Sequence, residues 1–422
     1  MSNTILGIQG TRFTINGDLV YREIPNSNPM AHGLLMNARF IQGVFDDARD
    51  PSRFARFGRD QWDPDANTDA LIAALPEWHR YGLRAFTVGF QGGAPRNTIP
   101  NREIENNPFG EDGKRIDPKY LDRMDRLIRA ADAAGMIAIV SFFYEGQAQR
   151  MRDGRAFRDA TITASRFLRE NGYTNVIIEV ANEHEVGQFR DHPVISDPES
   201  MALLIDLARE ESGGIPVGCS GGGGRAFPQV VEASDVTLIH GNSLTRQRYA
   251  NFIRRVREWA PDKPILCNED SHALGQLKVA FATSTSWGYF NSVMKQEPPA
   301  DWGVQPGDDR FFAHRMAEGI GIPCEPIPVE EQFLLCGLEP HRHYQNQRWI
   351  RLPCLYPEQV DHVDFLRNGE LCDQCFDEPF MVHWNSNFKQ SGVESHPSDQ
   401  EWKARIHLRS GEILERTVAC GF

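Results

Sequence analysis

Short apolar runs alternate with longer amphipathic stretches over most of the chain. The short runs are rich in β-branched and aromatic residues, whereas the longer stretches carry apolar residues at every third or fourth position. This alternation is typical of parallel strands that are connected by crossover helices. The eight candidate strands are residues 34–41, 85–89, 137–143, 176–180, 216–219, 236–240, 265–267 and 285–289.

The amphipathic stretches have the length and the start signals of helices, and several open on Asp or Pro. In residues 118–134, Leu121, Met124, Ile128 and Ala131 follow one another at spacings of three and four. They form one apolar stripe, which is predicted to face the sheet. The predicted helices are residues 68–81, 118–134, 156–171, 198–210 and 247–259.

The number of strand and helix units predicts the architecture. Gly82, Gly135 and Gly172 each follow a predicted helix, where a left-handed residue would turn the chain toward the next strand. Eight units between residues 34 and about 320 match the roughly 250 residues of a (β/α)₈ barrel, the TIM barrel. A doubly wound open sheet is the alternative, but it would carry fewer strands and a glycine fingerprint after the first.

A hairpin is predicted ahead of the barrel. Residues 12–15 and 19–22 flank Asn16-Gly17, which is a signal for a type I′ turn. We expect this hairpin to cap the floor of the barrel and assign residues 1–325 to one catalytic domain.

The pattern changes after Ile320, where three prolines mark a linker and no convincing helix follows. Strand-like segments and the turn signal Asn368-Gly369 predict a small antiparallel β-sandwich over residues 326–422. Residues 362–369, with the Glu-Pro-Phe and Trp that follow, resemble bacterial immunoglobulin-like modules appended to carbohydrate-active enzymes. The predicted strands are residues 348–352, 362–366, 380–384 and 404–408.

The composition of the chain limits which ligands and cellular partners are expected. The chain has 45 basic and 58 acidic residues, a net charge of −13, which argues against nucleic acid and favours neutral or cationic ligands. No apolar run reaches the roughly 20 residues of a membrane helix, and the start lacks a signal segment. We therefore expect a cytoplasmic protein without a membrane partner, although a chain whose leader had been removed would read the same. Cys372 and Cys375 form a close pair but are half a zinc site at best, so no metal is predicted.

Polar residues gather where the predicted strands end, and in barrels the working residues lie at those carboxyl ends. Glu183 and Glu269 each follow an apolar strand core and an Asn, at the ends of the fourth and seventh strands. Carboxyl groups that face each other across a barrel mouth are the apparatus for cleaving glycosidic bonds.

These strand ends resemble clan A of the glycoside hydrolases, retaining (β/α)₈ enzymes with Asn-Glu after strand four and Glu after strand seven. The resemblance implies that Glu183 is the acid/base, Glu269 the nucleophile and Asn182 a partner of the sugar 2-hydroxyl. It further implies that His240 is the strand-six histidine and Trp287 the strand-eight aromatic beneath the reacting sugar. The implied reaction is hydrolysis of β-glycosidic bonds of an oligo- or polysaccharide through a covalent glycosyl-enzyme intermediate, without a cofactor.

The chain also departs from the clan pattern. Thr87 stands where relatives often carry an arginine, and Arg39 on the first strand is expected to replace that cation. Tyr144 occupies the usual strand-three histidine region. Together with Arg39 and Tyr144, Asp46 and Asn242 are candidate substrate-binding residues, and neither the sugar nor the oligomeric state follows from the sequence.

Two other functions are weighed. A metal-dependent barrel hydrolase could use His240, Glu269, Asp270 and His272, but it would be expected to carry His-x-His on the first strand, where this chain has Asn-Ala-Arg. A non-catalytic carbohydrate-binding barrel would be expected to lack one of the two glutamates, and both are present.

Overall fold

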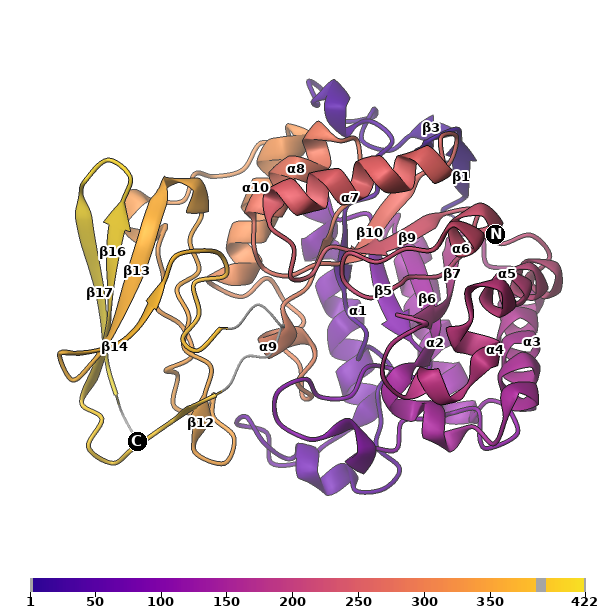
Figure 1. Ribbon diagram of the computed structural model, residues 1–422, viewed down its shortest axis with the longest axis horizontal. Helices are drawn as coiled ribbons and strands as arrows, with labels where there is room; N and C mark the ends of the chain where they lie inside the picture. The colour runs from indigo at the N-terminus through magenta and orange to yellow at the C-terminus, as the bar shows by residue number, and fades with distance from the viewer. Residues whose placement is uncertain (1–2, 385–391, 421–422) are drawn as a thin grey trace.

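A computed structural model describes residues 3–384 and 392–420 of the chain. Its centre is a six-stranded parallel sheet in the order β11-β4-β5-β6-β7-β8 (Figure 1). The strands are β4 (Asn37–Arg39), β5 (Ala85–Gly89), β6 (Ile137–Tyr144), β7 (Val176–Asn182), β8 (Val217–Gly218) and β11 (Gly288–Tyr289).

Two further parallel strands, β9 (Thr237–His240) and β10 (Ile265–Glu269), pair with each other. Backbone hydrogen bonds link this pair to both edges of the larger sheet: Cys267 N donates to Ser286 O, just before β11, and Asp235 N donates to Val217 O in β8. All eight predicted strands are therefore present, and the first, fifth and eighth are shorter than expected.

Helices follow most of the strands and pack their apolar sides on the sheet (Figure 1). Asp63, Asp117, Asp153 and Asp197 each accept a hydrogen bond from a backbone N–H of the first turn that follows, which explains where four of the helices begin. The helices are α1 (Pro64–Arg80), α2 (Pro118–Ala133), α3 (Gly154–Glu170), α4 (Pro193–Ser196), α5 (Pro198–Ser212), α6 (Pro228–Ala233), α7 (Arg246–Trp259), α8 (Gly275–Ala282), α9 (Ser292–Lys295) and α10 (Asp308–Ile320).

The five predicted helices are confirmed with small shifts at their ends. Gly82, Gly135 and Gly172 have φ angles of 105°, 73° and 68°, the left-handed conformation expected after a helix. Short 3₁₀ helices lie in the loops, at Pro29–Ala31, Pro51–Phe54, Asn101–Glu103, Glu145–Arg150, Gly187–Asp191, Val329–Glu331 and Pro357–Gln359. None of the described helices combines the length and the apolar character that a membrane crossing needs.

The N-terminal segment forms a three-stranded antiparallel sheet of β1 (Leu6–Gln9), β2 (Arg12–Ile15) and β3 (Asp18–Leu19). Asn16 and Gly17 have φ angles of 55° and 90°, as a type I′ turn requires. Leu6 N donates to Thr174 O, and the Tyr21 hydroxyl donates to Gly82 O. Both acceptors lie just before strands of the large sheet, so this segment packs against the amino ends of those strands.

The C-terminal region holds a four-stranded antiparallel sheet in the order β14-β13-β16-β17 and a separate strand pair (Figure 1). Residues 380–384 do not form the predicted continuous strand: Met381 makes an isolated bridge to Arg351, and Val382 N donates to Ile350 O. Proline explains part of the difference, because Pro353 and Pro379 have no N–H for a ladder. The strands are β12 (Gln347–Arg348), β13 (Val360–Arg367), β14 (Glu370–Cys375), β15 (Val393–Glu394), β16 (Glu401–Leu408) and β17 (Ile413–Ala419).

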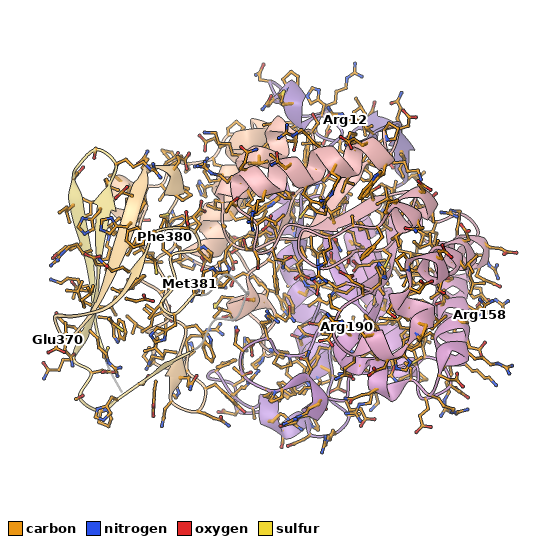
Figure 2. All side chains as sticks on the ribbon, in the orientation of Figure 1. Arg12, Arg158, Arg190, Glu370, Phe380 and Met381 are labelled. Atoms are coloured by element: carbon orange, nitrogen blue, oxygen red, sulfur yellow. The ribbon has the colours of Figure 1, made fainter. Side chains whose placement is uncertain are left out.

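One face of the four-stranded sheet buries Val363, Phe365 and Trp402 in a core that is formed mostly with irregular segments of the described chain and includes Val393 of β15. The irregular layer also contacts the α/β part. Arg351 Nε lies 2.6 Å from Asp308 Oδ2 at the start of α10, and both side chains are buried. Figure 2 shows Phe380 and Met381 on the side of the C-terminal region that faces the α/β part.

Candidate active site

The first glutamate of the candidate site lies directly after β7. Glu183 has a φ of 55°, a left-handed conformation that is uncommon for a residue with a side chain. Its backbone N–H donates to Ser220 Oγ at 3.1 Å, and Ser220 Oγ donates to the buried Glu179 at 2.7 Å. Asn268 also donates to Glu179, at 2.9 Å. A buried polar network thus holds the strand end at the point where Glu183 leaves it.

The second glutamate ends β10, at a position where the pairing of β10 with β9 shifts its register. Glu269 is buried, and Arg39 Nε lies 2.9 Å from its Oε2, while Asn242 Nδ2 donates to Oε1 at 2.7 Å. Burial by itself raises the pKa of this carboxyl, but Arg39, His240 and Asn242 outweigh that effect and hold the pKa below its usual value. Glu269 is therefore ionised at neutral pH.

His240 connects the two glutamates. Its Nδ1 lies 2.9 Å from Glu183 Oε1 and 3.9 Å from Glu269 Oε2. One carboxylate oxygen of each glutamate and a ring nitrogen of His240 all lie within 4.8 Å of one another. Burial lowers the pKa of His240, but the surrounding carboxylates Glu269, Glu183 and Glu179 raise it by more. The imidazole is therefore biased toward its charged form.

These groups border a cavity of about 290 Å³, near the lower end of the range for small-molecule sites. Five residues that the sequence analysis singled out line it: Tyr144, Asn182, Glu183, Asn242 and Glu269. Arg39 and His240 are buried and reach the cavity through their contacts with the glutamates. Burial also raises the pKa of the lining Tyr144 to about 12, so its hydroxyl is protonated.

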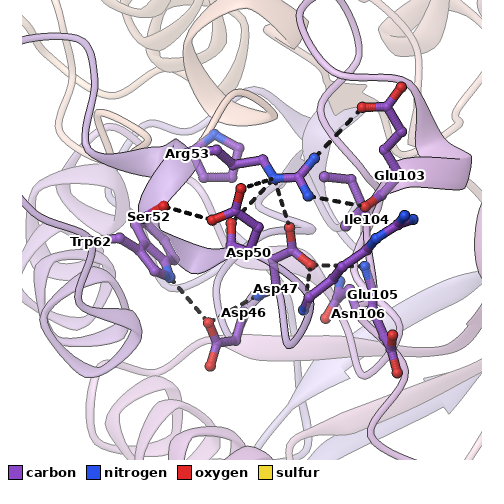
Figure 3. A network of polar contacts seen from close by, with 12 residues as sticks. Asp46, Asp47, Asp50, Ser52, Arg53, Trp62, Glu103, Ile104, Glu105 and Asn106 are labelled. Carbon is purple, nitrogen blue, oxygen red and sulfur yellow. Dashed lines mark hydrogen bonds and ion pairs between the residues drawn. The ribbon is translucent and has the colours of Figure 1, made fainter.

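Two candidate residues lie elsewhere. Trp287 has no exposed surface, and its Nε1 donates to Asp270 at 2.7 Å, so it is not available to lie beneath a sugar. Asp46 accepts a hydrogen bond from Trp62 Nε1 at 3.2 Å and belongs to the network of the loop after β4 (Figure 3). In that network Glu105 N donates to Asp47 at 2.9 Å. Neither residue lines the cavity.

The cavity wall includes residues that the sequence analysis missed. Phe290 lines the cavity as a second aromatic beside Tyr144, and the Arg39 guanidinium lies 5.5 Å from its ring centroid. It directly follows the last residue of β11, so its place after the strand end is the signal that could have separated it from the buried Trp287. Arg96, Arg190 and Arg225 also line the cavity. They lie in loops, where hydrophobic periodicity carries no information.

The arrangement bears on a metal site as well. At the cavity, the possible metal ligands found close together are Glu183, His240 and Glu269, as far as residues 3–384 and 392–420 are concerned. His272, a member of the metal-hydrolase set, contacts Met381 Sδ at 3.2 Å instead. Asp270 accepts a hydrogen bond from Trp287 Nε1, and burial raises the pKa of the Asp270 carboxyl to about 8. The four-residue set expected for a metal-dependent hydrolase is therefore not assembled around one point.

Comparison with known proteins gives no sequence relative: no family model and no curated protein matches the chain. Solved structures do match. A candidate glycoside hydrolase from Bacteroides vulgatus aligns with a TM-score of 0.50 and 11% identity over 96% of this chain and 82% of its own. The β-1,4-D-mannanase from Cryptopygus antarcticus aligns with a TM-score of 0.48 and 11% identity over 74% and 94% of the two chains. The likeness to the Bacteroides protein shows a shared fold.

Proposed function

We propose that this protein is a retaining glycoside hydrolase that cleaves β-glycosidic bonds of an oligo- or polysaccharide. The observation that carries the proposal is the pair Glu183 and Glu269, which meet at one cavity from the ends of two strands. One carboxylate oxygen of Glu183 lies within 4.8 Å of one carboxylate oxygen of Glu269, and both lie within that distance of a ring nitrogen of His240. This closeness supports the retaining mechanism, whose two carboxyl groups lie about 5–5.5 Å apart, because an inverting pair is further separated to admit a water.

The surroundings of the two carboxyl groups support different roles. Arg39 and Asn242 keep Glu269 ionised and fix both of its oxygens, as a nucleophile requires. Glu183 is the more exposed of the two, with 23% of its side chain accessible against 9% for Glu269, and its carboxyl is oriented by His240. A group in this position can exchange a proton with the departing oxygen and with water.

The proposed reaction has two steps. In the first, Glu269 attacks the anomeric carbon, the bond to the glycosidic oxygen breaks, and Glu183 gives its proton to that oxygen. In the second, Glu183 takes a proton from water, the water oxygen attacks the anomeric carbon, and Glu269 leaves. Asn182, Asn242 and Tyr144 are positioned on the cavity wall to bind sugar hydroxyls.

We further propose that the parallel strands close into a (β/α)₈ barrel and that residues 1–325 form the catalytic domain. The backbone hydrogen bonds from the β9–β10 pair to β8 and to the segment before β11 support closure. The assignment of residues 326–422 to an accessory immunoglobulin-like domain rests on their antiparallel sheet and separate apolar core.

Azide rescue tests the proposal. Aryl β-glycosides are incubated with wild type and with Glu269→Gly, with and without sodium azide. We expect the variant to be inactive until azide attacks the anomeric carbon in place of the lost carboxylate, giving a glycosyl azide of inverted configuration. In Glu183→Gly, azide is expected to give the retained configuration, because Glu269 still forms the intermediate. If wild type cleaves no glycoside while it binds oligosaccharides, the non-catalytic binding barrel replaces this proposal.

A further inference from the structure

Three arginines stand on the wall of the catalytic cavity, and the proposed reaction assigns no role to them. Arg96 follows β5, Arg190 lies in the 3₁₀ helix Gly187–Asp191 after β7, and Arg225 follows β8. All three are exposed. Figure 2 shows Arg190 on the α/β part of the molecule, far from Glu370 in the C-terminal sheet. Three separate loops thus bring a guanidinium group to the same cavity.

The charge of this cavity differs in sign from that of the whole protein. The chain carries a net charge of −13, yet the charged residues on the cavity wall are three arginines and two glutamates. Of the two glutamates, Glu269 is neutralised by Arg39 at 2.9 Å. Glu183 must hold a proton when the glycosidic bond breaks. At that stage the three arginines leave the cavity with a positive charge.

The contacts of two of the arginines, Arg190 and Arg225, leave N–H groups able to bind an anion. Arg225 Nη1 lies 3.7 Å from Glu185 Oε1, which is too long for a hydrogen bond, and the Glu185 carboxylate accepts a hydrogen bond from Gly222 N at 3.0 Å instead. Arg190 Nε donates to the backbone carbonyl of Glu185 at 3.4 Å, which leaves its charge uncompensated by that contact. Arg96 lies close enough to Glu269 for its charge to help lower the pKa of that carboxyl.

We infer that the substrate carries an anionic group, a uronate carboxylate or a sulfate ester, on a sugar that occupies this cavity. This inference rests on the proposed glycosidase function and names its substrate class. Guanidinium groups bind carboxylates and sulfates through paired, charge-assisted hydrogen bonds, which neutral hydroxyls do not require. A positive cavity in a negatively charged protein also concentrates anionic substrate at the site.

The experiment compares substrates that differ at one carbon. Nitrophenyl β-glucuronide, nitrophenyl β-glucoside 6-sulfate and the neutral nitrophenyl β-glucoside are assayed at low and high salt, with the galacto series alongside. We expect an anionic substrate to exceed its neutral congener about tenfold or more in kcat/KM, and this advantage to shrink as salt screens the arginines. The carboxylate and sulfate arms tell which anion the site prefers.

Arg190→Ala and Arg225→Ala are compared with Arg158→Ala, an exposed arginine of α3 that removes the same charge away from the cavity (Figure 2). The cavity variants are expected to raise KM about tenfold more for the anionic substrate than for the neutral one, while Arg158→Ala changes neither KM. Calorimetric titration of Glu183→Gln with methyl β-glucuronide and methyl β-glucoside gives a readout that does not need turnover.

The two proposals fail in different ways. Cleavage of neutral glycosides with equal or better kcat/KM than the anionic ones, insensitive to salt and to Arg190→Ala, overturns the anionic substrate and leaves the glycosidase standing. If no glycoside is cleaved but the titration shows glucuronide binding that depends on Arg190, the proposed reaction fails and the anion site remains. If the titration favours the neutral glycoside, the anion site is overturned in that case as well.

Discussion

Among the residues that the structure describes, two clusters bring histidine and carboxylate ligand atoms together, one at the candidate active-site cavity and one on the C-terminal sheet. In each, three ligand atoms lie within 4.8 Å of one another, from Glu183, His240 and Glu269 in the first and from His362, Asp364 and His407 in the second. Both clusters therefore combine imidazole and carboxylate groups at similar closeness, with two glutamates and one histidine in the first and two histidines and one aspartate in the second.

Their surroundings differ. The cavity cluster is built on strand ends, and Arg39 beside it is 99% buried. The C-terminal cluster lies across paired strands, where His362 and His407 are opposite each other and their rings stack with centroids 4.0 Å apart. Asp364 accepts from Gln374 at 2.8 Å and contacts His407 Nε2 at 3.0 Å, so its oxygens serve the sheet itself.

The comparison teaches that a cluster becomes a candidate site when a cavity and a desolvated counter-charge accompany it. On the C-terminal sheet, the histidine and aspartate side chains contact one another and Gln374 of the neighbouring strand. Three predictions follow from this difference, in order of decreasing effect.

The largest expected effect is a loss of kcat when one carboxylate charge is removed at the cavity, and the same change in the C-terminal cluster is the control. Glu269→Gln and Glu183→Gln should each lower kcat about 10³-fold or more, because nucleophilic attack and proton transfer are lost while the shape is kept. Asp364→Asn should leave kcat unchanged. Steady-state kinetics on a hydrolysed glycoside, with circular dichroism to show normal folding, measures this. Wild-type turnover by either cavity variant would remove the mechanism.

A smaller effect is expected from the cation beside Glu269. Arg39→Gln removes the charge that keeps the pKa of Glu269 low, so that pKa rises and the acid limb of the pH profile of kcat/KM moves to higher pH. At pH 5 the variant should lose about tenfold more kcat/KM than at pH 7.

Arg351→Gln is the matched control, because Arg351 is also buried and paired with a buried carboxylate, Asp308. It should lower the melting temperature without moving the acid limb. An acid limb that stays in place in Arg39→Gln would contradict the ionised state assigned to Glu269.

The smallest effect concerns stability in the C-terminal region. Burial raises the pKa of Asp364, but Gln374 and His407 outweigh this effect and hold it below its usual value. At pH values above the pKa that Asp364 has in the unfolded chain, the ionised carboxylate therefore stabilises the fold. This stabilisation is lost as the pH falls through the lowered pKa of the folded protein. Asp364→Asn should cost about 1 kcal/mol or less in the free energy of unfolding at pH 7, and a smaller amount at pH 2. Urea unfolding at the two pH values measures this, and an equal cost at both would assign the effect to packing.

Predictability from sequence differed between the two regions for physical reasons. Residues 85–89 and the helix over residues 118–134 were predicted almost to the residue, because buried strands and amphipathic helices leave strong periodic patterns. Residues 380–384 were wrongly predicted as a strand. There the chain packs as an irregular segment on the C-terminal sheet, and apolar residues buried in that way look the same in sequence as a strand.

The residues of the candidate site were also predicted from the sequence only in part. Position after an apolar strand core placed Glu183, Glu269, Asn182 and Asn242 at one cavity, because carboxyl ends of parallel strands share one edge. Trp287, which the resemblance to clan A implied as the aromatic beneath the sugar, is fully buried, and Phe290 after the strand end lines the cavity instead.

The amino-acid sequence by itself determined the parallel α/β architecture, the antiparallel C-terminal strands and the two carboxylates at strand ends, since these follow from local periodicity and from the order of the units. Only the tertiary structure decided that Arg39 neutralises Glu269, that Phe290 rather than Trp287 lines the cavity, and that three arginines from separate loops surround it. Such contacts depend on how distant loops fold over the strand ends, and local pattern carries no record of that arrangement.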